Sequence, residues 1–287
     1  MIEGYLVKYR GYLWLVKGCE HFDEYVIAYP RYDAANQVKI KDTGRALHVA
    51  RKLGVVRYDE CLKLEVPLVR KDEIEEVLDP FDGESWPQLP REISEILDGL
   101  DPGELGEVGL TGSYLASVVL RNIKPRDVDL VIKDVSVGFK IYRKLRDLRE
   151  RGVAKPLSVV EEHEGTDWET RVKLLRDRVL EGVLGNIVYS IRIVSCKRST
   201  EPVCLENAEL LSDELVIVEE VSPIVMPYIY ITTSSKLGKI PVRSLRMRYS
   251  EIAVGTKLIV SNCRLERYAD GSACVGLDGR ECVVKLK

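Results

Sequence analysis

The periodicity of apolar residues changes twice along the chain, and this change constrains the fold more than any other feature of the sequence. In residues 1–70, segments such as YLWLVKG and YVIAYPRY alternate apolar and polar side chains, as short half-buried strands do. Beyond the acidic run DEIEEVLDPFDGESWPQLP, helix-like and strand-like segments alternate, which is typical of an α/β or α+β unit. The closing part of the chain returns to strand-like alternation and favours a small β barrel or sandwich.

A chain of 287 residues predicts two or three compact units, because an average domain has roughly 100 to 200 residues. We expect a β-rich N-terminal domain at 1–80, an α+β domain at 81–205 and a β-rich C-terminal domain at 206–287. Hydrophobic residues make up 45% of the chain and charged residues 31%, which is the composition of an ordered soluble protein.

The chain is expected to be cytoplasmic and to have no membrane partner. No stretch approaches the roughly 20 apolar residues that cross a bilayer. The start, MIEGYLVKYRGYLW, lacks the basic segment and apolar core of a secretory signal. Gln occurs twice and Asn five times while Glu, Lys and Arg are plentiful, which indicates a thermophilic source.

Seven cysteines show neither a C-x-x-C motif nor a His at ligand spacing, so the sequence disfavours a structural zinc site. Two states remain open for them. They can be buried free thiols, or they can form the intracellular disulfides that hyperthermophiles use, for which Cys263, Cys274 and Cys282 lie close enough in sequence.

The net charge of -3 argues against a protein that coats nucleic acid indiscriminately, since such binding depends on clustered Lys and Arg. The charge is nevertheless uneven. Residues 72–107 carry 13 acids and one Arg, whereas residues 230–287 carry 11 Lys and Arg and 5 acids. The basic C-terminal part is compatible with a nucleic-acid partner. The alternative is a solvated charged surface.

The segment GLTGSYLASVVLRNIKPRDVDLVI, Gly109–Ile132, holds the most informative motif. Gly112 allows a tight turn and a close approach of the backbone to a ligand. We expect Ser113 to occupy the N-cap of the helix that follows, where its hydroxyl and the free amides face a triphosphate. Side chains two apart on a strand share a face, so Asp127 and Asp129 project together and form a magnesium site with substrate phosphates.

This pattern resembles the signature of the nucleotidyltransferase superfamily, in which Gly-Ser is followed by an acid-apolar-acid strand. Here the interval is Tyr114 to Arg126. The flanking YLVKYRGYLWLVKGCEHFDEYVIAYPRY and SLRMRYSEIAVGTKLIVSNCRLER look like parts of archaeal predicted nucleotidyltransferases. The resemblance implies an α+β fold with a DNA polymerase β-like palm, a mixed sheet with helices on one face, between small β-rich domains.

The resemblance also implies a function. Superfamily members move a nucleoside monophosphate from a nucleoside triphosphate to a hydroxyl or phosphate acceptor, using Mg²⁺ (or Mn²⁺) held by three carboxylates. The third carboxylate is expected in the strand NIVYSIRIVSC, where its position is taken by Ser190. Either Glu161, Glu162 or Glu164 replaces it, or the protein is a degenerate module that binds nucleotide or nucleic acid.

Three arginines in the segment VRSLRMRYS, Arg243, Arg246 and Arg248, predict an exposed basic strand face that contacts a nucleic-acid acceptor. Four basic residues follow the acidic strand on a helix and allow either phosphate contacts or a solvated face: Arg143, Lys144, Arg146 and Arg149. The three histidines lie far apart in sequence, and no nucleophile motif surrounds them, so a hydrolytic triad is disfavoured.

Overall fold

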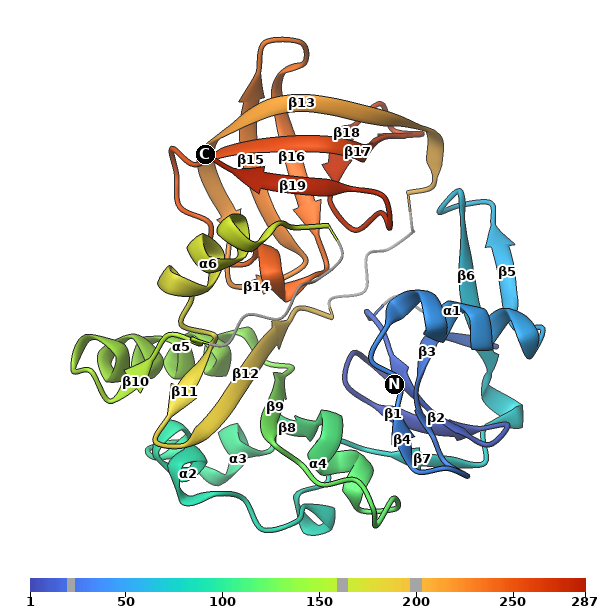
Figure 1. Cartoon of the computed structure of the whole chain (residues 1–287), viewed down its shortest axis with the longest axis vertical. Coiled ribbons are helices and arrows are strands. Elements are labelled where there is room, and N and C mark those ends of the chain that lie inside the picture. The colour runs from blue at the N-terminus through green and yellow to red at the C-terminus, as the bar shows by residue number, and fades with distance from the viewer. Residues whose placement is uncertain (20–23, 159–164, 197–202) are drawn as a thin grey trace. The chain divides into compact units, whose positions relative to one another are not determined.

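The computed structural model describes residues 1–19, 24–158, 165–196 and 203–287, which form two compact units (Figure 1). The first unit consists of Met1–Asp59, Leu64–Ala154 and Val183–Arg198. The second consists of Glu60–Lys63, Lys155–Gly182 and Ser199–Lys287. The domain boundaries near residues 80 and 205 stay predictions, because compact units do not by themselves show which segments fold independently.

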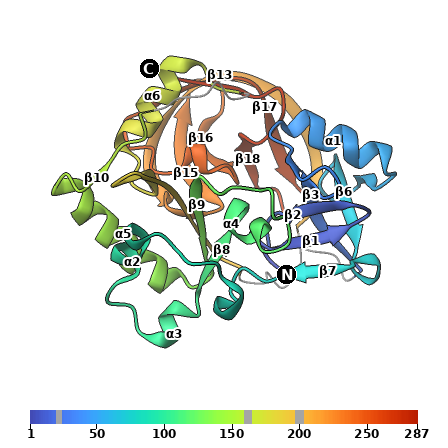
Figure 2. The same cartoon turned by 60° about the horizontal axis from the view of Figure 1, so that its bottom comes forward.

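The first unit begins with an antiparallel sheet, whose strands are seen in Figures 1 and 2. Its strands are β1 (Leu6–Tyr9), β2 (Tyr12–Val16), β3 (Tyr25–Asp33), β4 (Val38–Lys39), β5 (Val56–Asp59), β6 (Leu64–Arg70) and β7 (Glu76–Leu78). Their order is β5-β6-β3-β2-β1-β7, and β4 pairs with β3. Every strand except β7 pairs with a neighbour close in sequence, as the alternating pattern and its tight turns predict.

Both faces of this sheet are covered by apolar contacts. Trp14 packs on one face in a cluster that includes Ala50 of α1 (Thr43–Lys52). Its neighbour Leu13 points to the other face, where it packs with Tyr32 of β3 and with Leu115 of α4 (Gly112–Ser117). The N-terminal sheet therefore contributes directly to the core around the predicted Gly-Ser motif, since α4 begins with that motif.

The second sheet of this unit carries the acidic strand. Its strands are β8 (Val108–Thr111), β9 (Asp127–Ile132), β10 (Ala154–Lys155), β11 (Glu181–Leu184) and β12 (Ile187–Val194), in the order β10-β11-β12-β9-β8. β9 is antiparallel to β8 and parallel to β12. The helices are α2 (Arg91–Leu97), α3 (Pro102–Leu105), α4 and α5 (Val135–Glu150), and short 3₁₀ turns occur at Lys71–Glu73 and Gly83–Ser85.

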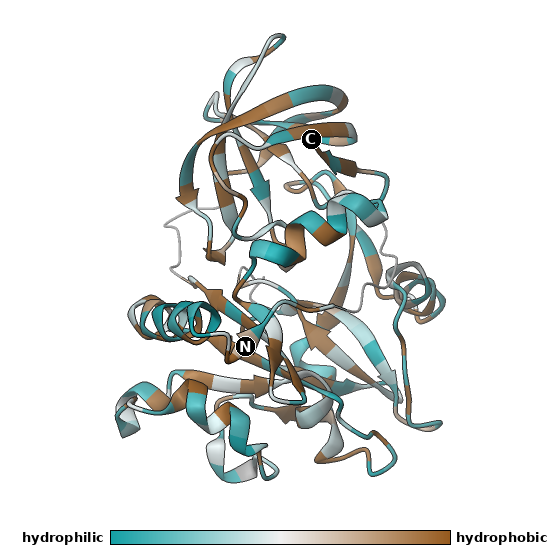
Figure 3. Cartoon of the chain, turned by 60° about the vertical axis from the view of Figure 1, so that its left-hand side comes forward, coloured by the Kyte–Doolittle hydropathy of each residue, from teal (hydrophilic) through white to brown (hydrophobic). Residues whose placement is uncertain are grey.

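The second unit holds a closed barrel. Its elements are α6 (Trp168–Asp177), β13 (Leu205–Ser222), β14 (Val225–Met226), β15 (Tyr228–Ser234), β16 (Gly238–Ser244), η3 (Met247–Tyr249), β17 (Lys257–Tyr268), β18 (Ala273–Gly276) and β19 (Val283–Leu286). The strand order is β13-β15-β16-β18-β17-β19, and β13 also pairs with β17, which closes the ring. Hydrophobic and hydrophilic residues alternate along these strands in Figure 3.

One pair of barrel strands is parallel, β16 with β18, while β13, β15 and β17 make antiparallel pairs. The closed ring has five strands, in the order β13-β15-β16-β18-β17, and β19 pairs with β17 outside the ring. A five-stranded barrel with this strand order is of the OB type. Barrels of this type serve many functions, so the topology describes the architecture and not the activity.

The predicted fold class, a polymerase β-like palm flanked by small β-rich domains, is wrong. Within the described residues there are six α-helices and nineteen strands, and the strands form three sheets of antiparallel or mixed type. The physical reason is the length of the helices between residues 81 and 130. The pattern SYLASVVLRN favours a helix of ten residues, but α4 ends at Ser117, before the β-branched Val118 and Val119.

The cysteines form three disulfides: Cys19–Cys196 in the first unit, and Cys61–Cys204 and Cys263–Cys282 in the second. Only Cys274 is a free thiol, and it is buried. Of the two states that the sequence left open, disulfide formation therefore applies to all cysteines but one.

Candidate functional site

The two acids of the β9 motif lie on one face of the strand. Asp127 and Asp129 are partly buried, whereas Val128 and Leu130 between and after them are fully buried in the core on the opposite face. Two-residue periodicity of the strand produces this arrangement. Both carboxylates therefore point toward the same side of the sheet.

The turn between β8 and α4 lies against these acids. Gly112 has a φ of +65°, a conformation that L side chains rarely adopt. A Cβ placed on Gly112 would lie 3.0 Å from the Cγ of Asp129 and would overlap its Oδ2 atom. Glycine is thus required here for the backbone conformation and for the approach of the Asp129 carboxylate.

Ser113 has a different role from the predicted one. The N-cap of α4 is Thr111, whose side chain makes no capping hydrogen bond, and α4 has only six residues. The Ser113 hydroxyl instead donates to the Asp127 Oδ1 atom over 3.2 Å. Ser113 therefore orients the first acid of the pair, and the expected presentation of Ser113 as a helix cap is wrong.

Ser190 lies beside the second acid. In the parallel pairing of β12 with β9, Ser190 is the register partner of Asp129, and its hydroxyl donates to the Asp129 Oδ1 atom. The structure thus brings Gly112, Ser113, Asp127, Asp129 and Ser190 together. The acids proposed to replace Ser190 lie outside the described residues: Glu161, Glu162 and Glu164.

The electrostatics of the pair favour either a proton or a cation between the two carboxylates. Burial raises the pKa of the Asp129 carboxyl, and the negative charge of Asp127 raises that pKa further. The Ser190 hydrogen bond and the charges of Arg192 and Lys39 act in the opposite direction. Since two like charges in a desolvated place repel each other, either a proton or a cation between them lowers the free energy.

The donor set suits magnesium better than a transition metal. Mg²⁺ is commonly bound by one or two carboxylates, with substrate phosphates and water completing its octahedron. Asp127 and Asp129 supply two such carboxylates, and the absence of a Cβ on Gly112 lets the Asp129 carboxylate lie against this turn. Within the described ranges, no group of three or more His, Cys, Asp or Glu side chains is arranged to hold a metal by protein ligands alone.

Replacing Gly112 by Ala is expected to destabilise the protein by about 2 kcal/mol or more, because a positive φ costs roughly 1–2 kcal/mol and the methyl group displaces Asp129. Gly152→Ala is the matched control: Gly152 has a φ of +72° but nothing within 4 Å of a Cβ, so it bears only the backbone cost. Guanidinium denaturation would compare the two variants. Equal losses would mean that the Asp129 contact contributes nothing.

Sequence reasoning missed residues of the N-terminal sheet near the acids. Tyr32 is fully buried and packs on α4, and both Asp129 and Asp127 act on its hydroxyl electrostatically. Arg192, on β12, forms an ion pair with the buried Glu3. The alternation in YVIAYPRY places Tyr32 on one face of β3, but no sequence signal shows that this face packs against α4.

The three arginines of the predicted nucleic-acid contact lie in the second unit, and their segment is not one continuous strand. β16 ends at Ser244, and η3 (Met247–Tyr249) follows. Arg243 forms an ion pair with Glu266 over 3.0 Å, and Arg246 donates to the Asp278 carbonyl oxygen over 2.9 Å. Their guanidinium groups are therefore engaged within the barrel. The role of Arg243, Arg246 and Arg248 in nucleic-acid binding stays a prediction.

Three of the four basic residues that the sequence places on α5 lie at its surface, whereas the Nε and Nη1 atoms of Arg149 are buried. Arg143 and Arg146 are exposed, Lys144 pairs with Asp98, and Arg146 pairs with Glu150. These pairs fit the solvated helix face that the sequence allowed, and pairs of this kind contribute little to stability. Within the described part of the chain, no helix is both long and apolar enough to cross a membrane.

Comparisons with known proteins give no family for this chain. No protein-family model matches it, and no curated protein matches it. Among solved structures, it is similar to the crystal structure of the tetrameric p202 HIN2, with a TM-score of 0.25 and 10% sequence identity. The match covers 37% of this chain and 61% of that chain, so the chain spans less than two thirds of that structure.

The assignment to the nucleotidyltransferase superfamily, and to archaeal members of it, is therefore wrong. The described residues form mainly β-sheets with few helices, unlike the helix-covered palm of those proteins. A Gly-Ser turn and an Asp-x-Asp strand are short motifs, and unrelated folds can contain them.

Proposed function

We propose that the acid pair binds a nucleoside triphosphate through Mg²⁺ or Mn²⁺, and that the site transfers a nucleoside monophosphate to a hydroxyl or phosphate acceptor. The observation that carries the proposal is the approach of Asp129 to Gly112 and of Ser113 to Asp127. Two partly buried carboxylates gain a cation at this turn, and the cation in turn needs phosphate oxygens to complete its shell. Asp127 and Asp129 are the proposed metal ligands.

A second candidate function is a module that binds the nucleotide with little or no turnover. Ser190 favours it, because a hydroxyl stands beside Asp129 where a third acid would bind a second metal ion. In two-metal transfer, the second ion activates the attacking oxygen. A neutral hydroxyl is a poor ligand for that ion, so we expect slow transfer from the natural protein.

Ser190→Asp distinguishes the two candidates. We expect it to raise the rate of transfer up to roughly a hundredfold, which corresponds to about 3 kcal/mol of transition-state stabilisation. The measurement is incorporation of label from each radiolabelled triphosphate into total cellular RNA, with Mg²⁺ or Mn²⁺. Ser190→Ala is the control, since it removes the hydrogen bond to Asp129 without adding a carboxylate.

The added carboxylate of Ser190→Asp should also make Mg²⁺ more stabilising, so the rise in melting temperature on adding Mg²⁺ should exceed that of the natural protein. If the natural protein transfers nucleotides rapidly and Ser190→Asp is slower, another acid serves as the third ligand. If neither protein transfers but the natural one binds a triphosphate, the binding module is correct.

A nucleic-acid acceptor is part of this proposal. It depends on the basic character of residues 230–287 and on Arg243, Arg246 and Arg248. The RNA in the transfer assay tests it directly. Label that stays in small molecules would exclude RNA as the acceptor.

A further inference from the structure

We infer that the β3–β4 hairpin of the N-terminal sheet contributes phosphate-binding groups to this site. The Lys39 ammonium binds the triphosphate, and the Tyr32 hydroxyl donates a hydrogen bond to a phosphate oxygen or to a metal-bound water. This inference rests on the proposed function and deepens it. It assigns a binding role to a segment outside the Gly-Ser and Asp-x-Asp motifs.

The register of the hairpin places the two side chains together. Tyr32 of β3 and Lys39 of β4 are direct partners in the antiparallel pairing, so their side chains lie on the same face of the sheet. The face is identified by Tyr32, which packs with Leu115 and Ala116 of α4. Lys39 therefore lies on the side of the sheet that faces α4 and the acid pair.

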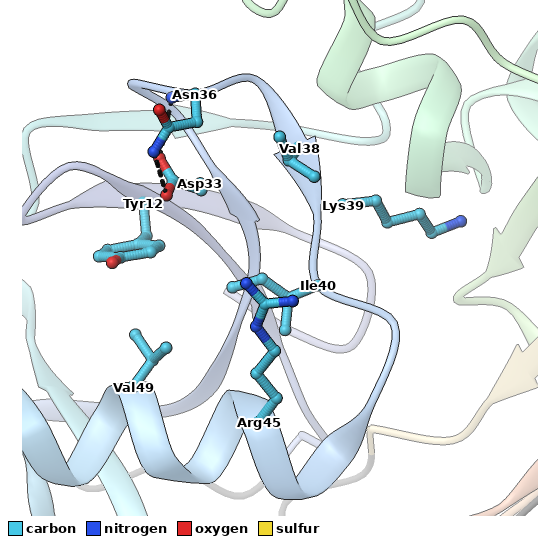
Figure 4. Close-up of a pocket in the computed structure, with 8 residues that line it drawn as sticks. All are labelled: Tyr12, Asp33, Asn36, Val38, Lys39, Ile40, Arg45 and Val49. Atoms are coloured by element: carbon cyan, nitrogen blue, oxygen red, sulfur yellow. Dashed lines mark hydrogen bonds between the residues drawn. The ribbon is translucent and has the colours of Figure 1, made fainter.

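The charge of Lys39 acts on Asp129, but Lys39 forms no salt bridge with a carboxylate of the described residues. It borders a pocket of about 230 Å³ between β4 and α1, and in Figure 4 its side chain extends away from the other residues that line the pocket. Its charge acts on Asp129, yet within the described residues no carboxylate lies within salt-bridge distance of its nitrogen. An ammonium near a carboxylate pair without a salt bridge is available for a phosphate oxygen.

Tyr32 provides an independent sign that a ligand belongs here. Its side chain is fully buried, and its hydroxyl has no hydrogen-bond partner in the described part of the chain. A buried hydroxyl without a partner costs roughly 1–3 kcal/mol. Tyr32 packs on α4, which begins beside the acids, and burial together with the charges of Asp129 and Asp127 raises the pKa of Tyr32, so its hydroxyl keeps the proton that it can donate. A metal-bound water or phosphate oxygen would satisfy it.

The test uses the full chain and inorganic tripolyphosphate with Mg²⁺, because this probe carries no base and isolates phosphate recognition. Lys39→Gln is expected to weaken its binding by about ten- to a hundredfold, as the loss of a charged hydrogen bond implies. Lys39→Arg should restore most of the affinity. Lys52→Gln is the matched control: Lys52 is exposed at the end of α1, and the charge change is the same.

Tyr32→Phe should weaken binding about fivefold without lowering the melting temperature, because the hydroxyl has no protein partner to lose. Isothermal titration calorimetry and thermal melts give both readouts. Equal affinity in Lys39→Gln and Lys52→Gln would overturn the role of Lys39 while the proposed function stands. A parallel loss of melting temperature in Lys39→Gln that Lys39→Arg does not rescue would show a structural role instead.

The proposed function fails separately. If the natural protein binds neither tripolyphosphate nor any of the four nucleoside triphosphates with Mg²⁺ or Mn²⁺, both the proposed function and the inference about Lys39 are overturned. If Tyr32→Phe binds tripolyphosphate as tightly as the natural protein does, the Tyr32 hydroxyl does not contact the ligand.

Discussion

Replacing Asp127 and Asp129 together by Asn is expected to reduce Mg²⁺-dependent binding of nucleoside triphosphate by at least about a hundredfold. Each lost charged contact weakens binding by roughly 1.5–3 kcal/mol, and the two acids are the proposed protein ligands of the ion. Asn keeps the shape of Asp and can still accept the hydrogen bonds from Ser113 and Ser190. Calorimetric titration with Mg²⁺ and each triphosphate measures the effect, and Asp147→Asn on the exposed face of α5 is the control.

The single variant Asp129→Asn should raise the melting temperature of the metal-free protein at neutral pH. The pKa of Asp129 is raised in the folded state by burial and by Asp127, so the folded protein binds this proton more tightly than the unfolded chain. The stability contributed by the group is then present below the unfolded pKa and is lost as the pH rises through the raised pKa. Asn removes that loss.

The same shift gives the pH dependence of binding. The metal requires a deprotonated Asp129, so affinity for Mg²⁺ and triphosphate should fall as the pH is lowered through the raised pKa of this carboxyl. An Asp129→Asn variant that melts below the natural protein without metal, or that binds Mg²⁺ and triphosphate equally well, would contradict the role of the pair.

The local geometry of the site could be predicted from the sequence. Two-residue periodicity in DVDLVI places Asp127 and Asp129 on one face, and the need for close approach predicts glycine at position 112. These features depend on a few neighbouring residues and on backbone stereochemistry alone. They are therefore visible in the motif, whatever fold surrounds it.

The surroundings of the motif could not be predicted in the same way. Periodicity indicates that YVIAYPRY forms a strand, but the packing of Tyr32 on α4 joins segments about eighty residues apart. The strand with Ser190 gives no signal for its parallel register with β9, which follows from the packing of the whole sheet. The family assignment failed for a related reason: a short motif was extended to a complete fold, although the surrounding segments are mainly strands.

Removing the Cys19–Cys196 disulfide by replacing both cysteines with Ser is expected to lower the free energy of unfolding by up to about 5 kcal/mol. The two cysteines are 177 residues apart, so the crosslink restricts a long segment of the unfolded chain. Cys263 and Cys282 are 19 residues apart, and the same relation gives about 3 kcal/mol for their disulfide.

The order of these two losses is the test, because the loop lengths predict that the Cys19–Cys196 pair stabilises its unit more than the Cys263–Cys282 pair does. Guanidinium denaturation should be followed in each unit separately, since two units need not unfold in one step. Trp14 is buried in the core of the first unit and Trp168 is exposed in the second, so tryptophan fluorescence reports mainly the first. Hydrogen exchange of the backbone amides in the barrel strands reports the second. Cys274→Ser is the control for the loss of a buried thiol that forms no disulfide. If the Cys19–Cys196 double variant loses no more stability than Cys274→Ser, this crosslink does not constrain the chain in solution.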